Sequence, residues 1–148
     1  VSIAWADGSI EAHHEHLISE VLEDFLRKLR QEFHTVPGHG RVLLCTMPGE
    51  RHRLDLLMAA LAYAAQGART ELLGVDLPIT SIAQAARILK VDRVAVSLSI
   101  QCTGEPTRRM LQELKNRLPQ DCRLLVGGKG ATRTRRIQGV GRMLELNA

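Results

Sequence analysis

The sequence predicts an α/β fold, in which a parallel sheet carries helices on both faces and a partial helical cap precedes it. From residue 41 onward, short continuous apolar runs alternate with amphipathic or Leu- and Ala-rich segments. This alternation is typical of parallel strands that helices bury on both faces. The 148 residues are 45% hydrophobic and 24% charged, which is ordinary for one globular domain with a small appendage.

Residues 1–36 are expected to form the helical cap segment, as part of a helix bundle. Apolar residues recur there at three- and four-residue steps, which predicts one amphipathic helix from about Ser9, its N-cap, to Phe33. One such helix cannot bury its stripe alone, so we expect it to pack on the following domain or on other helices. Pro37 and two glycines then interrupt the pattern. The apolar stripe consists of Ile10, Leu17, Val21, Leu22, Phe25, Leu26 and Leu29.

Residues 37–148 are expected to form a single domain of alternating strands and helices. Strands are predicted at 42–45, 70–73, 94–98, 124–126 and 143–146. Helices are predicted at 51–65, 81–89 and 107–118. Gly67 ends the first of these helices and Pro106 opens the last. This order predicts a Rossmann-like (flavodoxin-like) sheet, in which ligands bind beyond the carboxyl ends of the strands.

The composition excludes several classes of function. Four aromatic residues are too few for a nucleic-acid module that stacks bases on aromatic side chains. No apolar run approaches the roughly 20 residues of a membrane helix, so no membrane contact is expected. The net charge of +4 is modest and does not indicate a nucleic-acid partner. Three cysteines without a C-x-x-C pair indicate free thiols in a reducing cytoplasm.

Chemically useful residues follow the predicted strands. After the first strand, His52 lies at a strand-to-helix turn, two residues beyond Glu50. A carboxylate at that spacing can accept one ring N–H and leave the other ring nitrogen for a metal, although a charged surface turn has the same pattern. Ser97 and Ser99 follow the third strand and can bond a ligand or their own backbone. The glycines at 127–130 permit close approach, but without P-loop or G-x-G-x-x-G spacing.

Together these strand ends resemble the cobalamin-binding Rossmann-like domain, whose pattern is D-x-H-x-x-G, then S-x-L or a variant, then GG. The corresponding residues here are Glu50-x-His52-x-x-Asp55, Ser97-Leu98-Ser99 and Gly127-Gly128. Upstream, Trp5 is followed by nine residues and then by Glu15-His16. That arrangement resembles the light-sensing domains of CarH- and LitR-type regulators of the MerR family. The stretches 48–52 (PGERH), 74–78 (GVDLP) and 127–131 (GGKGA) are similar to the same group.

The resemblance implies that cobalamin is the cofactor, with adenosylcobalamin favoured over hydroxocobalamin or methylcobalamin. His52 would be the lower axial cobalt ligand, displacing the cofactor's dimethylbenzimidazole base, and Glu50 would support it. Trp5, Glu15 and His16 would cap the upper face, while the nucleotide tail would run past the serines and glycines. The implied cofactor-binding residues are Trp5, Glu15, His16, Gly49, Glu50, Arg51, His52, Leu54, Asp55, Asp76, Leu77, Ser97, Leu98, Ser99, Gly127, Gly128, Gly130 and Ala131.

Two positions depart from the family pattern. Asp55 stands where the turn motif ends in Gly, and Ala6 follows the Trp where some light sensors carry a His. After photolysis the upper cobalt ligand is therefore expected to be water or one of the nearby histidines, which are His13, His14 and His16. The basic run Lys129, Arg133, Arg135 and Arg136 is expected to be a solvated face.

The resemblance implies a non-enzymatic, cytoplasmic light sensor that controls transcription. DNA would be contacted only indirectly, through a missing DNA-binding domain or a partner regulator, and the oligomeric state would depend on light or cofactor. The alternative is a corrinoid carrier domain of a methyltransferase, which resembles residues after the linker but lacks the W-x9-E-H pattern. A haem- or cobalamin-sensing domain without a light response is a third reading, because six histidines suffice for haem.

Overall fold

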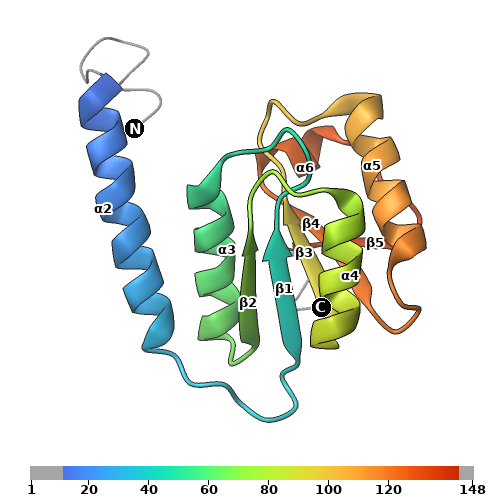
Figure 1. The fold of residues 1–148 in the computed structure, drawn as a ribbon, viewed down its shortest axis with the longest axis horizontal. Coiled ribbons are helices and arrows are strands. Elements are labelled where there is room, and N and C mark those ends of the chain that lie inside the picture. Colours follow the sequence, from blue (N-terminus) through green and yellow to red (C-terminus); the bar gives the residue numbers. More distant parts are fainter. Residues whose placement is uncertain (1–11, 144–148) are drawn as a thin grey trace.

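The computed structural model describes residues 12–143 and has the α/β architecture that the sequence predicts (Figure 1). All neighbouring strands of the sheet are parallel, in the order β2-β1-β3-β4-β5. The strands are β1 (Arg41–Cys45), β2 (Arg69–Gly74), β3 (Arg93–Ser97), β4 (Arg123–Gly127) and β5 (Val140–Arg142). The helices are α2 (Ala12–Gln31), α3 (Arg53–Ala65), α4 (Ile79–Leu89), α5 (Gly104–Arg117) and α6 (Lys129–Arg133).

The strand register brings the predicted site segments to one edge of the sheet. Cys45 at the end of β1 lies beside Val96 of β3, and Ser97 lies beside Gly127 at the end of β4. The strand order reverses at β1 and β3, which is where open parallel sheets bind ligands. The loops after β1, β3 and β4 therefore start at nearly the same height along the strand direction, at the carboxyl edge of the sheet.

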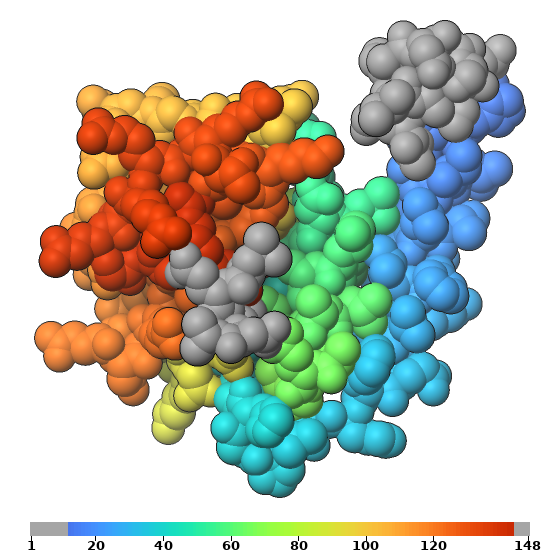
Figure 2. All heavy atoms as spheres, turned by 180° about the vertical axis from the view of Figure 1, so that it is seen from behind, coloured from blue at the N-terminus to red at the C-terminus, as the bar shows by residue number. Residues whose placement is uncertain are grey.

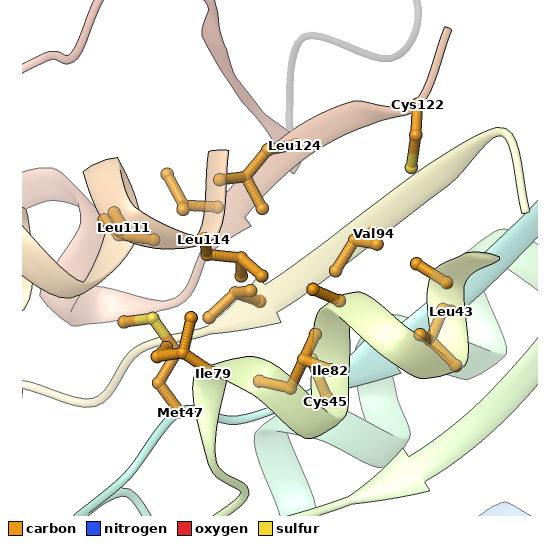
Figure 3. Close-up of a cluster of buried hydrophobic side chains, with 14 of the residues drawn as sticks. Leu43, Cys45, Met47, Ile79, Ile82, Val94, Leu111, Leu114, Cys122 and Leu124 are labelled. Atoms are coloured by element: carbon orange, nitrogen blue, oxygen red, sulfur yellow. The ribbon is translucent and has the colours of Figure 1, made fainter. Parts of the chain in front are cut away.

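Helices bury the two faces of the sheet unequally. On one face, β1, β3 and β4 pack against α4 and α5 through a large cluster that includes Leu43, Val94, Ile82 and Leu114 (Figure 3). Successive strand residues point to opposite faces. The other face therefore holds a smaller cluster beneath α3, formed by Val42, Leu44, Leu56, Ala60, Tyr63, Ala68, Ala95 and Leu125.

The first four strands and the three domain helices lie where the sequence predicts them, within a few residues. Helix α5 begins at Gly104 rather than 107, so Pro106 lies inside its first turn, where its missing N–H leaves no helical hydrogen bond unmade. The fifth strand is predicted at 143–146, of which only Met143 is described; it lies directly after β5 (Val140–Arg142), and residues 144–146 lie outside the described part of the chain. The short helix α6 was not predicted. Ser9 and Ile10 of the expected cap helix lie outside the described residues.

Helix α2 lies along α3 and contacts it through a mainly polar face (Figures 1 and 2). The buried Glu23 carboxylate pairs with Arg27 at 3.2 Å and with Arg53 of α3 at 3.6 Å. The Arg30 guanidinium donates to Thr70 Oγ1 at 2.8 Å. Most of the apolar stripe faces away from α3: Leu17, Val21 and Phe25 are 64%, 61% and 58% exposed, whereas Leu26 and Leu29 are half-buried. The following domain, one of the two expected partners, therefore leaves most of the described part of this stripe unburied.

The described part of the chain, residues 12–143, contains no helix with the length and apolar character needed to span a membrane.

Removal of the Glu23 charge is expected to loosen α2 without unfolding the sheet. In Glu23→Gln the ion pairs to Arg27 and Arg53 weaken, which should cost about 1 kcal/mol for pairs that are partly solvated. Hydrogen exchange should therefore accelerate by about fivefold for α2 amides, while strand amides keep their rates. Glu20→Gln, at an exposed position of the same helix, is the matched control. Unchanged α2 exchange in Glu23→Gln would show that these ion pairs do not hold the helix.

Candidate functional site

Glu50 and His52 form a hydrogen-bonded pair in the turn between β1 and α3. Glu50 Oε1 accepts the His52 backbone N–H at 2.9 Å and lies 2.6 Å from His52 Nδ1. The carboxylate has no proton to give, so Nδ1 is the donor and Nε2 of the neutral ring keeps its lone pair. Glu50 is only 2% exposed, whereas the His52 side chain is 54% exposed. The pair therefore presents an oriented, accessible ring nitrogen, which is what a metal ligand requires.

Ser99 completes the hydrogen bonding of the Glu50 carboxylate. Its backbone N–H donates to Oε2 at 2.8 Å. Burial alone raises the pKa of Glu50, but hydrogen bonds from the Ser99 hydroxyl and backbone and from the His52 backbone and ring outweigh it. The net effect lowers the pKa of Glu50 to about 2, so the group is a carboxylate at neutral pH. The β1 turn and the β3 loop are thereby joined through one buried anion.

Cys102 lies close enough to the same carboxylate to be affected by it. Burial, together with a hydrogen bond to Glu50 and its negative charge, raises the pKa of Cys102 to about 11. The thiol is therefore protonated at neutral pH and is not a reactive thiolate. All three cysteines, including the buried Cys45 and Cys122, are free, as the sequence predicted.

Two side chains outside the motif hold the β1 turn in place. Thr46 Oγ1 donates to the Glu50 carbonyl at 2.6 Å and accepts the Asp76 N–H at 2.8 Å. Asp76 Oδ1 accepts the Gly49 N–H at 2.8 Å, and its Oδ2 accepts from Arg51 Nε at 3.2 Å. Asp76 adopts a φ of 55°, a left-handed conformation that Asp tolerates better than most residues. The β2 loop thus fixes the turn that carries His52.

A cavity of about 850 Å³ opens beside this edge, between α3 and the ends of β3 and β4. The helix contributes small side chains, Ala59 and Ala62, one turn apart, which leave space above the sheet. Most of the wall is apolar, with positive side chains on the C-terminal side. The lining residues are Asp55, Met58, Ala59, Ala62, Tyr63, Gln66, Ser97, Val126, Gly127, Gly128, Lys129, Ala131, Thr132, Arg136, Arg142 and Met143.

The glycines after β4 allow two close approaches. A Cβ on Gly128, whose φ is +87°, would lie 2.4 Å from the Leu98 carbonyl oxygen, and one on Gly130 would lie 2.1 Å from that of Ser99. These two glycines therefore seat the β4 loop against the loop that contacts Glu50. A Cβ on Gly127 would lie 2.3 Å from Met143 Sδ, at the cavity wall. The missing side chain of Gly127 thus lets Met143 pack against the backbone at the cavity wall. The resemblance implies space for a nucleotide tail on this side of the sheet.

The structure divides the expected binding residues into three groups. The turn and its support contain Gly49, Glu50, Arg51, His52, Asp76 and Ser99. The cavity wall contains Asp55, Ser97, Gly127, Gly128 and Ala131. Of the others after residue 36, Leu54 is half-buried in α3, Leu77 and Leu98 pack in the α4–α5 core, and Gly130 packs on Ser99 of the first group.

Glu15 and His16 lie on α2, eight and seven residues before Glu23, and so on the same side of the helix as Glu23. Glu23 contacts Arg53, the first residue of α3. At 1.5 Å per residue, Glu15 therefore lies roughly 12 Å along the α2 axis from that contact, towards the amino-terminal end of α2. The amino-terminal turns of α2 accordingly rise past the carboxyl edge of the sheet (Figure 1). His13 and His14 are exposed there, with ring centroids 4.0 Å apart. Trp5 lies outside the described residues.

Comparison with known proteins relates the chain to bacterial repressors. It is 31% identical over 129 residues to the HTH-type transcriptional repressor CarH of Myxococcus xanthus, matching 86% of this chain and 42% of that protein. The HTH-type transcriptional repressor CarA of the same organism is 27% identical over 122 residues, with 82% and 42% covered. The chain therefore spans less than half the length of these relatives. No protein-family model matches the sequence.

Solved structures show the same fold at lower identity. The methanol:cobalamin methyltransferase complex MtaBC from Methanosarcina barkeri matches with a TM-score of 0.52 and 18% identity, over 85% of this chain and 49% of that chain. The fold and its edge site define a Rossmann-like α/β domain, as the sequence predicted. More particularly, the chain is a relative of the CarH and CarA repressors, which confirms the resemblance drawn from its motifs.

The low pKa of Glu50 predicts a specific loss of stability in acid. The native carboxylate has a pKa of about 2, against an ordinary value of 4.5, so it stabilises the fold above pH 4.5 and progressively less as the pH falls towards 2. Between pH 6 and pH 2, wild type should lose up to about 3 kcal/mol relative to Glu50→Gln. Urea unfolding of both proteins, followed by circular dichroism at several pH values, measures this difference. If the free energy of unfolding of wild type and of Glu50→Gln falls equally with pH, the low pKa of Glu50 is contradicted.

Proposed function

We propose that this chain is a cobalamin-binding regulatory domain and that His52 is the lower axial ligand of cobalt, in place of the cofactor's own base. The observation that carries the proposal is the Glu50–His52 contact of 2.6 Å, which leaves Nε2 with a free lone pair at the carboxyl edge of the sheet. A neutral imidazole whose second nitrogen is held by a carboxylate is a common metal ligand. Kinship to transcriptional repressors supports the regulatory part of the proposal.

The residues present fit a corrinoid with a displaced base. Such a cofactor needs a nitrogen donor for the metal and a separate space for its nucleotide tail. His52 supplies the first, and the cavity that begins at Asp55 and Ser97 supplies the second at the same edge. Its volume of about 850 Å³ is typical of small-molecule sites. Lys129 and Arg136 are exposed, as predicted for a solvated face, and also line the cavity, where they suit the phosphodiester of the tail.

The upper face of the cofactor would be capped by residues 1–36, with 37–148 forming the binding domain. Glu15 and His16 lie on the face of α2 that extends past the carboxyl edge, and Trp5 would join them. Adenosylcobalamin, when bound, would supply a cobalt–carbon bond that light breaks. The protein's part is to convert occupancy of the upper side into the position of α2, which polar contacts of Glu23 and Arg30 hold on the domain.

A shift of α2 would expose or cover its apolar stripe and so change what the protein binds. We infer that light alters the oligomeric state in this way, and that transcription responds through a DNA-binding domain or a partner regulator. The protein itself would catalyse no reaction in this role.

A corrinoid carrier domain is the second candidate, and its support is the likeness to the methanol:cobalamin methyltransferase complex. A carrier holds the same cofactor but passes a methyl group to an acceptor. Incubation of the methylcobalamin complex with a thiol acceptor separates the two functions: methyl transfer favours the carrier, and a light-driven change in elution volume favours the sensor. Binding of haem without any binding of cobalamin would favour the third function, a haem sensor.

The lower-ligand assignment predicts the behaviour of His52→Ala. With adenosylcobalamin added in darkness, wild type should show the absorption spectrum of a base-off cofactor with a histidine ligand. His52→Ala should lose that spectrum and bind at least about tenfold more weakly, because the metal loses a protein donor. His34→Ala removes an exposed histidine far from this edge and serves as the control. A wild-type spectrum in His52→Ala would exclude this ligand.

The upper ligand after illumination is expected to be a histidine of the first α2 turns or water. Spectra of illuminated His13→Ala, His14→Ala and His16→Ala should identify the ligand, because loss of a second imidazole shifts the cobalamin bands. If one variant alone differs from wild type, its histidine binds cobalt after photolysis. An unchanged photoproduct in all three variants excludes a histidine from this helix and leaves water.

A further inference from the structure

The segment that begins with β4 carries basic side chains and no acidic one. Residues 122–144 hold six of the chain's 20 Lys and Arg residues and none of its 16 Asp and Glu residues. The rest of the chain holds more acidic than basic residues, so the net charge of +4 comes from this segment. Its basic residues are Arg123, Lys129, Arg133, Arg135, Arg136 and Arg142.

Residues 129–136, which we call the basic loop, expose their cations without neutralising them. Exposed arginines elsewhere in the chain pair with carboxylates, as Arg117 does with Glu113 at 3.0 Å. Arg133 and Arg135, in contrast, make no ion pair with any residue between 12 and 143. A face that only has to be solvated gains nothing from crowded like charges, which repel one another. The uncompensated charge of the basic loop therefore indicates an anionic partner.

The backbone of the basic loop is held in one conformation by buried anchors. Ala131, Thr134 and Ile137 are buried at three-residue intervals, and the positions between them are exposed. Thr134 Oγ1 donates to the Gly130 carbonyl at 2.9 Å. The Arg142 guanidinium donates to the Ala131 carbonyl and, at 2.9 Å, to the Thr134 carbonyl. The cations between the anchors therefore start from a fixed backbone, which lowers the entropy cost of binding.

The surroundings of the basic loop favour a phosphate backbone over a protein or a membrane. Among residues 12–143, no large hydrophobic side chain is exposed after Ile100 and no aromatic residue follows Tyr63. A protein interface would need an apolar or aromatic centre, and a membrane surface would need apolar side chains to insert. Guanidinium groups alone match phosphate oxygens, which they can bind with two parallel hydrogen bonds.

The basic loop lies apart from the cap helix and only partly overlaps the cavity. Figure 2 shows the orange-to-red segment after β4 on the side of the molecule away from α2, which is blue. Lys129 and Arg136 line the cavity, whereas Arg133 and Arg135 do not. The last two arginines can therefore contact a partner while the cavity is occupied.

We propose that the basic loop binds the phosphate backbone of double-stranded DNA, through Arg133 and Arg135. The choice of DNA among polyanions rests on the proposed function, a role in transcription. The contact carries no sequence information, because the loop has no aromatic side chain and reads only phosphates. It adds a direct, sequence-independent contact to the indirect route through a DNA-binding domain or a partner regulator.

The double variant Arg133→Gln/Arg135→Gln tests the inference. Binding of the 148-residue chain to a fluorescently labelled duplex of arbitrary sequence is measured by anisotropy at several salt concentrations. The loss of two phosphate contacts should weaken binding about tenfold at about 50 mM salt. It should also reduce the slope of log binding constant against log salt by about 2. Lys28→Gln/Lys90→Gln removes the same charge at exposed positions of α2 and the α4 C-cap and should bind as wild type does.

Three outcomes would overturn the inference: no binding of wild type to the duplex at about 50 mM salt, an unchanged salt slope in Arg133→Gln/Arg135→Gln, or an equal loss of binding in the control variant. Tighter binding to phosphatidylserine vesicles than to the duplex would assign the basic loop to a membrane and would also overturn it. Dark binding of adenosylcobalamin should be the same in wild type and in Arg133→Gln/Arg135→Gln, because neither arginine lines the cavity. If wild type binds DNA but no cobalamin, the cobalamin-binding function fails and the role of the basic loop stands.

Discussion

The buried Glu50 carboxylate is the constraint on which the site depends. A charge that is 98% buried is stable only with several hydrogen-bond donors, and Glu50 draws them from His52 in the β1 turn and Ser99 in the β3 loop. Those donors meet because β1 and β3 are neighbours in register, with Cys45 beside Val96. The sheet order therefore fixes the carboxylate, and the carboxylate fixes the tautomer of His52. Gly128 and Gly130 contribute indirectly by letting the β4 loop approach Ser99.

Helix α3 connects the proposed metal ligand, the cap helix α2 and the cavity. It begins directly after His52, its first residue Arg53 holds Glu23 of the cap helix, and its later turns form the wall of the cavity. A cap held by ion pairs is easier to release than one held by a large apolar contact, because its attachment is partly solvated. The apolar stripe of α2 consequently remains available for other helices, which suits a switch that changes its partners.

Local patterns predicted most of the fold and the centre of the site. Continuous apolar runs identified β1 to β4, because strands buried on both faces need such runs, and the spacing of Glu50 and His52 identified their contact. The direction of the α2 stripe could not be predicted, since periodicity shows that a face is apolar but not what it packs against. Thr46 was missed because its role depends on a hydrogen bond from Asp76, which lies in a loop distant in sequence. Small residues at 59 and 62, one turn apart in the helix after His52, were the available signal for the cavity.

The central claim, that His52 replaces the cofactor's base on cobalt, is tested most directly by electron paramagnetic resonance of the bound cobalt(II) cofactor. Protein labelled with nitrogen-15 only in its histidine side chains carries a ligand nucleus that splits each cobalt line into a doublet, whereas an unlabelled benzimidazole splits it into a triplet. The account predicts doublets in labelled wild type and triplets in unlabelled wild type. Triplets in the labelled protein would show that the cofactor keeps its own base and would contradict the account.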